Sequence, residues 1–95
     1  MTVHWTISAL ADLKAVDAYI RRHSPRYADG VVERIFARSA QLADHPRLGP
    51  SVAEYHDESL RELYEGSYRI IYRVREQQVD IVAVVHSARR LPRGL

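Results

Sequence analysis

The chain has 95 residues and a mass of 10.9 kDa, which is enough for one compact domain and too little for two. Its content of 46% hydrophobic and 27% charged residues is that of a globular protein. The absence of cysteine excludes disulfides, thiolate metal sites and cysteine nucleophiles. No apolar run approaches the roughly 18 residues of a membrane-spanning helix. We therefore expect a single cytoplasmic domain over residues 1–95, with no metal, cofactor or membrane partner.

The formal net charge of +2 is unevenly distributed along the chain. Residues 1–60 carry seven basic and eight acidic side chains, whereas residues 61–95 carry seven arginines against four acids. Thirteen of the fourteen basic residues are arginine, whose planar fork suits phosphate or carboxylate. Codon bias could produce the same enrichment, so the arginine excess alone does not decide between a nucleic-acid partner and none.

The first half of the chain predicts a short strand followed by two helices. Alternating apolar residues predict a strand over Thr2–Ile7, and Ser8 is the expected N-cap of a helix over about residues 9–22. Ser24 and Pro25 are typical of a second helix start, and Pro46 requires that helix to end near residues 44–45. The short connection predicts an antiparallel helical hairpin.

The second half predicts a loop and three strands. Residues 46–58 are expected to form the loop. β-Rich or alternating runs then predict strands over Leu60–Tyr64, Tyr68–Val74 and Val79–His86, the last apolar on both faces and therefore central. The tail Ser87–Leu95 holds no clear element. The order β-α-α-β-β-β predicts a two-layer α+β fold, in which the hairpin packs on one face of a mostly antiparallel four-stranded sheet.

Strand alternation assigns the arginines to a face of this sheet. Tyr68, Ile70, Tyr72 and Val74 are large and share one face, which we place against the helices. Arg69 and Arg73 then lie on the other face, which no helix is left to cover. With a favourable register, Arg61, Arg69 and His86 would converge there in one concave patch.

Three uses of such a patch are open. Arg61 or Arg73 could form cross-strand ion pairs with Glu62 or Glu76 on a solvated face. The patch could bind an acidic protein segment, or it could bind RNA phosphates beside a proton-transferring group.

The order and spacing of several short segments resemble the RelE/ParE superfamily of toxins from type II toxin–antitoxin pairs. The resemblance covers about residues 3–90. Its segments are Val3-His4-Trp5-Thr6, Ala11-Asp12-Leu13, Tyr19-Ile20, Pro25 with Ala28, His45-Pro46 with Gly49, Val52 with Glu54, Leu60-Arg61-Glu62-Leu63, Tyr68 to Val74, and Val84-Val85-His86 with Arg89.

This resemblance implies an antitoxin whose flexible C-terminal segment folds onto the toxin. It also implies one of two activities, because RelE-like members cut messenger RNA in the ribosomal A site and ParE-like members poison DNA gyrase. The long helical hairpin, the Pro-x-x-Gly turn and the Tyr-Arg-Ile-x-Tyr run are more similar to ParE.

The nuclease alternative would use Arg61, Arg69 and His86. Arg69 matches an arginine of RelE-type nucleases, and His86 could act as a general base. However, the lysine pair of RelE is missing, since the sole lysine is Lys14, and no tyrosine follows Tyr72.

We therefore expect a ParE-like toxin that inhibits gyrase by binding and is neutralised by a ParD-like antitoxin in a hetero-oligomer. Arg side chains would pair with acidic residues of the antitoxin, which would also occupy apolar grooves of the hairpin and sheet. A degenerate member kept as an antitoxin-binding module is a third possibility. The residues expected to bind the target are Arg69, Arg73, Arg89, Arg90 and Arg93.

Overall fold

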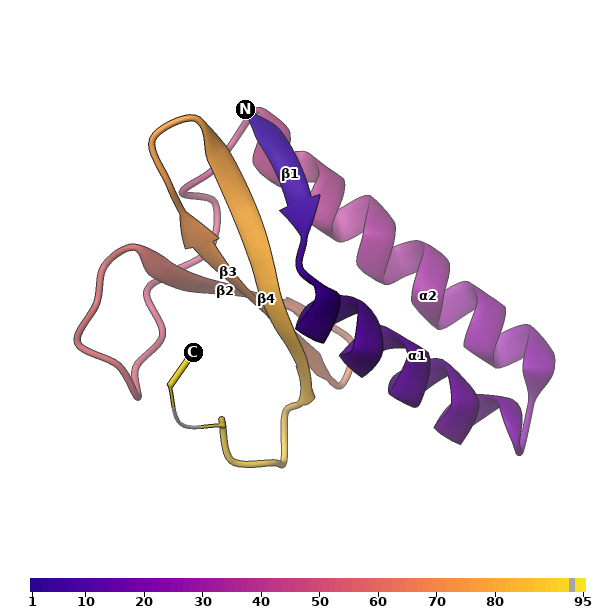
Figure 1. Ribbon diagram of the computed structural model, residues 1–95. Helices are drawn as coiled ribbons and strands as arrows, with labels where there is room; N and C mark the ends of the chain where they lie inside the picture. Colours follow the sequence, from indigo (N-terminus) through magenta and orange to yellow (C-terminus); the bar gives the residue numbers. More distant parts are fainter. Residues whose placement is uncertain (93) are drawn as a thin grey trace.

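A computed structural model describes residues 1–92 and 94–95. In this part of the chain the elements are β1 (Thr2–Trp5), α1 (Ile7–Arg21), α2 (Pro25–Ala40), the 3-10 turn η1 (Gln41–Ala43), β2 (Leu60–Glu65), β3 (Tyr68–Val74) and β4 (Gln78–His86). The strand order is β1-β4-β3-β2, with β1 parallel to β4 and the other two pairings antiparallel. The predicted α+β fold and the internal position of β4 are confirmed, and the two helices lie together on one side of the sheet (Figure 1).

The start of α1 differs from the sequence-based expectation. The N-cap is Thr6 rather than Ser8, so the helix begins two residues earlier than predicted. The Thr6 hydroxyl accepts a hydrogen bond from Ala9 N at 3.2 Å and donates one to Ile81 O at 2.8 Å. Thr6 therefore joins the helix start to β4, which a local pattern of residue types does not reveal. The start of α2 is as predicted, with Ser24 as N-cap and Pro25 in the first turn.

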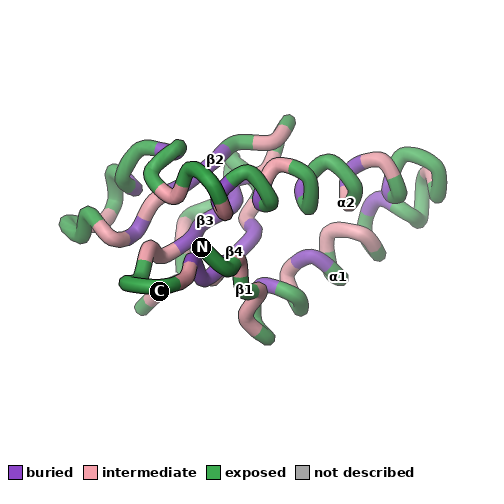
Figure 2. Tube along the Cα trace, turned by 90° about the horizontal axis from the view of Figure 1, so that it is seen from above, coloured by how far each residue is buried: buried purple, intermediate pink, exposed green. Residues whose placement is uncertain are grey.

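The main core lies between the helices and the sheet. Buried apolar residues recur along both helices and in β2, β3 and β4 (Figure 2). As predicted, Tyr68, Ile70, Tyr72 and Val74 all pack in this layer. β4 accommodates one extra residue: Ile71 lies opposite Ala83 and Tyr72 opposite Ile81, which leaves Val82 as a bulge.

The other face of the sheet is not bare, and this part of the prediction is wrong. The loop before β2 and the C-terminal segment both lie on the side of the sheet away from the helices (Figure 1). Together with the sheet they form a second, smaller apolar cluster. Its buried members are Val52, Leu60, Ile71 and Ala83, and Tyr55, Val82, Val85, Leu91 and Leu95 pack against them.

Gly49 attaches the loop to the edge of β2. Its N–H donates to the hydroxyl of Tyr72 at 3.0 Å, and its carbonyl accepts from Arg61 Nη1 at 2.8 Å. A Cβ at this position would lie 1.9 Å from the carbonyl oxygen of Glu62. Only glycine therefore allows the loop backbone to approach the strand this closely.

We predict that Gly49→Ala lowers the free energy of unfolding by about 1–3 kcal/mol, because the backbone of β2 cannot move away from the new methyl group without breaking its pairing. Gly30→Ala in α2 is the matched control. There the nearest obstacle is the flexible Arg34 guanidinium at 3.1 Å, and alanine favours a helix over glycine by about 1 kcal/mol. Urea denaturation at unchanged m-value measures both effects. Equal stability of the two variants would contradict the close approach of the Gly49 backbone to the Glu62 carbonyl.

Candidate functional site

Arg69 is the most buried of the arginines expected to bind a target. It lies in β3 on the face away from the helices, as predicted, but its side chain is only 6% exposed. Nε donates to Glu62 Oε1 at 2.6 Å, while Nη1 and Nη2 donate to Glu54 Oε2 at 2.9 Å and Oε1 at 3.0 Å. The guanidinium also lies 5.9 Å from the centre of the Tyr64 ring. The expectation that Arg69 is a free cation is therefore wrong.

The pKa values of this cluster follow from its hydrogen bonds. The Arg69 hydrogen bonds lower the pKa of the Glu54 carboxyl, although partial burial opposes the shift. Hydrogen bonds to Glu54, and then to Glu62, raise the pKa of Arg69 itself against the effect of burial. Both shifts favour the ion pair between Arg69 and Glu54, and the short contact with Glu62 adds a second carboxylate to the same guanidinium.

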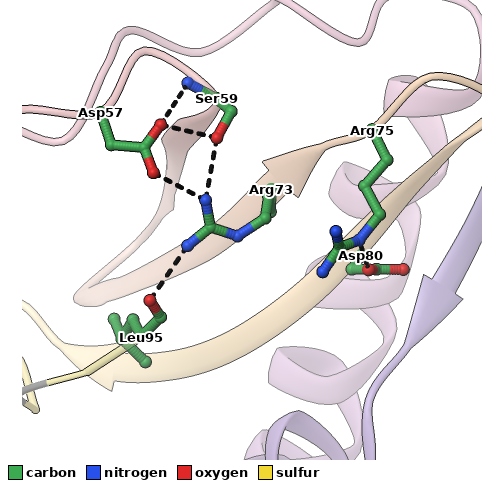
Figure 3. A network of polar contacts seen from close by, with 6 residues as sticks. All are labelled: Asp57, Ser59, Arg73, Arg75, Asp80 and Leu95. Atoms are coloured by element: carbon green, nitrogen blue, oxygen red, sulfur yellow. Dashed lines mark hydrogen bonds and ion pairs between the residues drawn. The ribbon is translucent and has the colours of Figure 1, made fainter.

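Arg73 is also engaged inside the protein (Figure 3). Nη1 donates to Asp57 Oδ2 at 2.7 Å and to Ser59 Oγ at 2.8 Å, and Nη2 donates to Leu95 O at 3.0 Å. The expected cross-strand partners Glu62 and Glu76 are not used by Arg73, whose ion-pair partner is Asp57. Arg73 thus holds the loop before β2 and the C-terminal segment against the same sheet face.

Asp57 and Asp80 complete the polar contacts of Figure 3. The Ser59 hydroxyl and then Arg73 lower the pKa of Asp57 from 3.8 to about 2. Asp80 bonds Arg75 through one carboxylate oxygen and accepts from Gln78 Nε2 at 2.6 Å through the other. Asp57 therefore contributes to this network, and no cluster of three or more potential metal ligands occurs among the described residues.

Arg61 and His86 lie on the helix side of the sheet, so the predicted convergence with Arg69 is wrong. The tight turn after β2 pairs Glu65 with Tyr68, which places Arg61 opposite Tyr72. His86 lies opposite Tyr68, four residues or about 13 Å further along β3. Arg69 lies on the opposite face, and the three candidate groups do not share a site.

His86 also lacks the surroundings of a general base. Its ring packs edge-on against Tyr68 with 5.5 Å between centroids, and Nδ1 accepts from Ala88 N at 3.1 Å. Within the described part of the chain, no carboxylate hydrogen-bonds this imidazole. A histidine that acts as a general base normally needs such a partner to orient its ring.

Arg89 and Arg90, the two described arginines after β4, are exposed. Arg89 and Arg90 follow the strand end and make no ion pair with any described residue. Arg90 borders a shallow hollow of about 370 Å³ together with Glu54, Tyr55, Leu91 and Gly94. Arg93, the third arginine expected in this group, lies outside the described residues.

A groove of about 510 Å³ runs between α1 and α2. Leu10, Leu13, Val32 and Phe36 give it an apolar floor, and Phe36 packs on Trp5 with 4.9 Å between ring centroids. Helical periodicity predicted the apolar stripes but not which members remain open to solvent. The charged side chains that line the groove are Lys14, Asp17, Arg21, Asp29 and Glu33.

Comparisons with known proteins agree with this architecture. The family model for the ParE toxin of type II toxin–antitoxin systems matches residues 3–91. Among curated relatives, toxin RelE2 of Caulobacter vibrioides is 38% identical over 92% of this chain and 96% of its own length. Toxin RelE3 of the same organism is 31% identical over 86% of this chain and 89% of its own.

Two solved structures have the same fold. A chain of the chromosomal ParDE system from P. aeruginosa has a TM-score of 0.74 at 24% identity, covering 90% of this chain and 95% of that one. A chain of the toxin–antitoxin complex RelBE2 from Mycobacterium tuberculosis has a TM-score of 0.58 at 28% identity, covering 93% and 92%.

The chain therefore belongs to the ParE toxin family. It is a toxin of a type II toxin–antitoxin system within the ParE/RelE superfamily, and its expected family membership is confirmed. Its relatives carry both ParE and RelE names, so this membership leaves the target undecided. In the described residues, no helix has the length and apolar character to cross a bilayer.

We predict that Arg69→Ala destabilises the fold by about 3–5 kcal/mol, because it leaves the carboxylate of Glu62, itself 8% exposed, buried without a counter-charge. Arg21→Ala is the control. Arg21 also forms two ion pairs, with Asp17 and Asp29, but these are exposed and should contribute little. Thermal or urea denaturation measures the difference. Equal losses in the two variants would show that Arg69 has no special structural role.

We predict that Asp57 stabilises the fold and that this stabilisation is lost at low pH. Its folded-state pKa of about 2 lies below the ordinary 3.8, so its stabilising effect is complete above pH 4 and disappears as the pH falls toward 2. The stability difference between the wild type and Asp57→Asn should therefore shrink over this interval. Asp44→Asn, at an exposed residue outside the described ion pairs, is the control. A difference that does not change with pH would contradict the assigned contacts.

Proposed function

We propose that this toxin acts by binding DNA gyrase and has no nuclease activity of its own. The observation that carries the proposal is the dispersal of Arg61, Arg69 and His86 over two faces of the sheet. Ribonuclease chemistry needs a cation at the scissile phosphate and a proton carrier within hydrogen-bond reach. Arg69 is instead neutralised by Glu54 and Glu62, and His86 packs against Tyr68.

A ribosome-dependent messenger RNA endonuclease is the second candidate. It is favoured by the names of the relatives RelE2 and RelE3, which share 38% and 31% of their aligned residues with this chain. This activity would require Arg61, Arg69 and His86 to be rearranged into one site on the ribosome.

In the proposed gyrase complex, the arginines after β4 contact the target. Arg89 and Arg90 are exposed, and the sequence holds no acid from Ala83 to its last residue. Arg93 extends the same basic segment in sequence. Arg69 and Arg73 are withdrawn from the proposed contact surface because both are occupied by internal carboxylates.

A cognate antitoxin is the proposed partner in the cytoplasm. The two structural neighbours come from ParDE and RelBE toxin–antitoxin systems. In this chain, the groove between α1 and α2 offers an apolar floor with charges of both signs along its margins. We propose that the flexible segment of the antitoxin places apolar side chains in this groove and acidic ones against Lys14 or Arg21.

The two activities are separated by testing one protein preparation in two assays. We expect inhibition of gyrase supercoiling and no cleavage of messenger RNA on translating ribosomes. Message cleavage that is lost in His86→Gln would overturn the gyrase proposal, and this exposed position avoids the folding defect expected of Arg69→Ala. Absence of both activities, with normal growth on expression, would also overturn it and would favour a module retained for antitoxin binding.

We predict that replacing Arg89, Arg90 and Arg93 together by alanine relieves growth inhibition and weakens gyrase inhibition at least about tenfold, since charge-assisted contacts each contribute strongly. Arg22, Arg26 and Arg34 at the helical hairpin provide a control triple with the same change in charge. Growth curves and supercoiling assays give the measurement. Undiminished toxicity of the variant that lacks these three C-terminal arginines would show that they do not contact the target.

A further inference from the structure

Three arginines on the helix side of β2 have no carboxylate partner among the described residues. Arg38 comes from α2, Arg47 from the loop after η1, and Arg61 from β2. None of them takes part in an ion pair of the described chain, whereas Arg21, Arg69, Arg73 and Arg75 all do. Arg61 therefore carries unpaired positive charge on the sheet face opposite to the one expected to be cationic.

Hydrogen bonds hold two of these arginines, Arg61 against the loop and Arg38 against β2. Arg61 Nη1 donates to Gly49 O at 2.8 Å, and Arg38 Nη1 donates to Gln41 Oε1 at 2.6 Å, with Arg38 Nε 3.5 Å from Tyr64 O. Arg47 precedes Gly49 by two residues. Two of the three side chains are thus tethered in place by neutral acceptors that leave their charge uncompensated.

The hydroxyl of Tyr72 lies beside the attachment point of the loop, because it accepts from Gly49 N at 3.0 Å while Gly49 O accepts from Arg61. Burial raises the pKa of Tyr72, while its hydrogen bond with Gly49 and the positive charges of Arg61, Arg38 and Arg47 oppose that rise. The nearest acids along β2 are occupied: Glu62 holds Arg69 on the other face, and Glu65 pairs with Arg34.

The Nε–H of Arg61 is the second, independent observation. This atom is buried and finds no hydrogen-bond acceptor among the described residues. Buried donors are rarely left in this state, and an unsatisfied one indicates a missing acceptor such as a bound anion or water. It lies within the group of three uncompensated arginines.

We propose that Arg38, Arg47 and Arg61 form a binding site for a phosphate group. A carboxylate has two oxygens and is satisfied by one guanidinium fork, as Glu54 is by Arg69 in this protein. A phosphate has more oxygens and up to two negative charges, so it can accept from three forks that approach from different elements. Three uncompensated arginines where α2, the loop after η1 and β2 meet match a phosphate better than a single carboxylate.

This site is distinct from the proposed gyrase contact at Arg89 and Arg90, and binding can be measured without gyrase. The phosphate could belong to a free ion or nucleotide, or to a nucleic-acid backbone, because the same oxygens are recognised in each. A backbone ligand would add the salt dependence of phosphate neutralisation. The experiment therefore includes inorganic phosphate and a labelled DNA duplex as separate probes.

The first measurement is an NMR titration of the wild-type protein with inorganic phosphate at constant ionic strength, with acetate as the reference anion. Phosphate should shift the Arg61 Nε–H and Gly49 amide signals in a saturable manner, and acetate should not. Equal responses to the two anions, or no saturable shift with phosphate, would overturn the proposal.

The second measurement compares Arg38→Gln/Arg47→Gln with the control Arg22→Gln/Arg26→Gln, which removes the same charge from the tip of the helical hairpin. The site variant spares the Arg61 contact with Gly49, so the fold should persist. Its affinity should fall about tenfold or more for whichever phosphate probe the wild type binds, while the control changes about twofold or less.

Fluorescence anisotropy with the labelled duplex identifies the source of the phosphate. Tighter binding of the duplex than of inorganic phosphate, with a salt slope reduced by about one for each arginine removed, would assign a nucleic-acid backbone. Binding of inorganic phosphate alone would assign a free ion or nucleotide. Capture of polyglutamate without any phosphate response would instead assign an acidic protein partner and overturn the proposal.

Discussion

The buried ion pair between Arg69 and Glu62, extended by Glu54, is the interaction on which the rest of this face depends. Glu54 belongs to the loop before β2, so the same guanidinium that joins two strands also holds the loop over the sheet. Val52 and Leu60 can then cover Ile71, and Arg73 draws Asp57 and the C-terminal segment onto the same face. Removing one partner would leave a charge in a place that water cannot easily reach.

This arrangement separates the arginines considered for ligand binding into two classes. Arg69 and Arg73 in β3 support the fold, because their charge is matched by the loop carboxylates Glu54 and Asp57. Arg89 and Arg90 after β4, and Arg38, Arg47 and Arg61 beside β2, are not matched by any described carboxylate, and they remain available to a ligand. A toxin without an assembled proton-transfer site can still act on a macromolecule through such free cations, which is the basis of the binding mechanism proposed above.

Local patterns predicted the elements well because they depend on near neighbours. Ser24 with Pro25 identified the start of α2, and the alternation from Tyr68 to Val74 identified both the strand and its helix-facing side. The position of Arg61 depended on strand register, which the Gly66-Ser67 turn sets and which residue types alone leave open. The partners of Arg69 lie 7 and 15 residues away, so no local pattern indicated that Glu54 would neutralise it.

The most direct test of this account is the exchange of the Arg69 Nε–H proton with solvent, followed by NMR in the free toxin. A guanidinium buried between Glu54 and Glu62 should give a resolved signal that exchanges far more slowly than that of exposed Arg26. The signal should also persist when the toxin binds its target. Exchange as fast as that of Arg26 would place Arg69 in solvent, and it would contradict both the internal ion pair and the division of the arginines built on it.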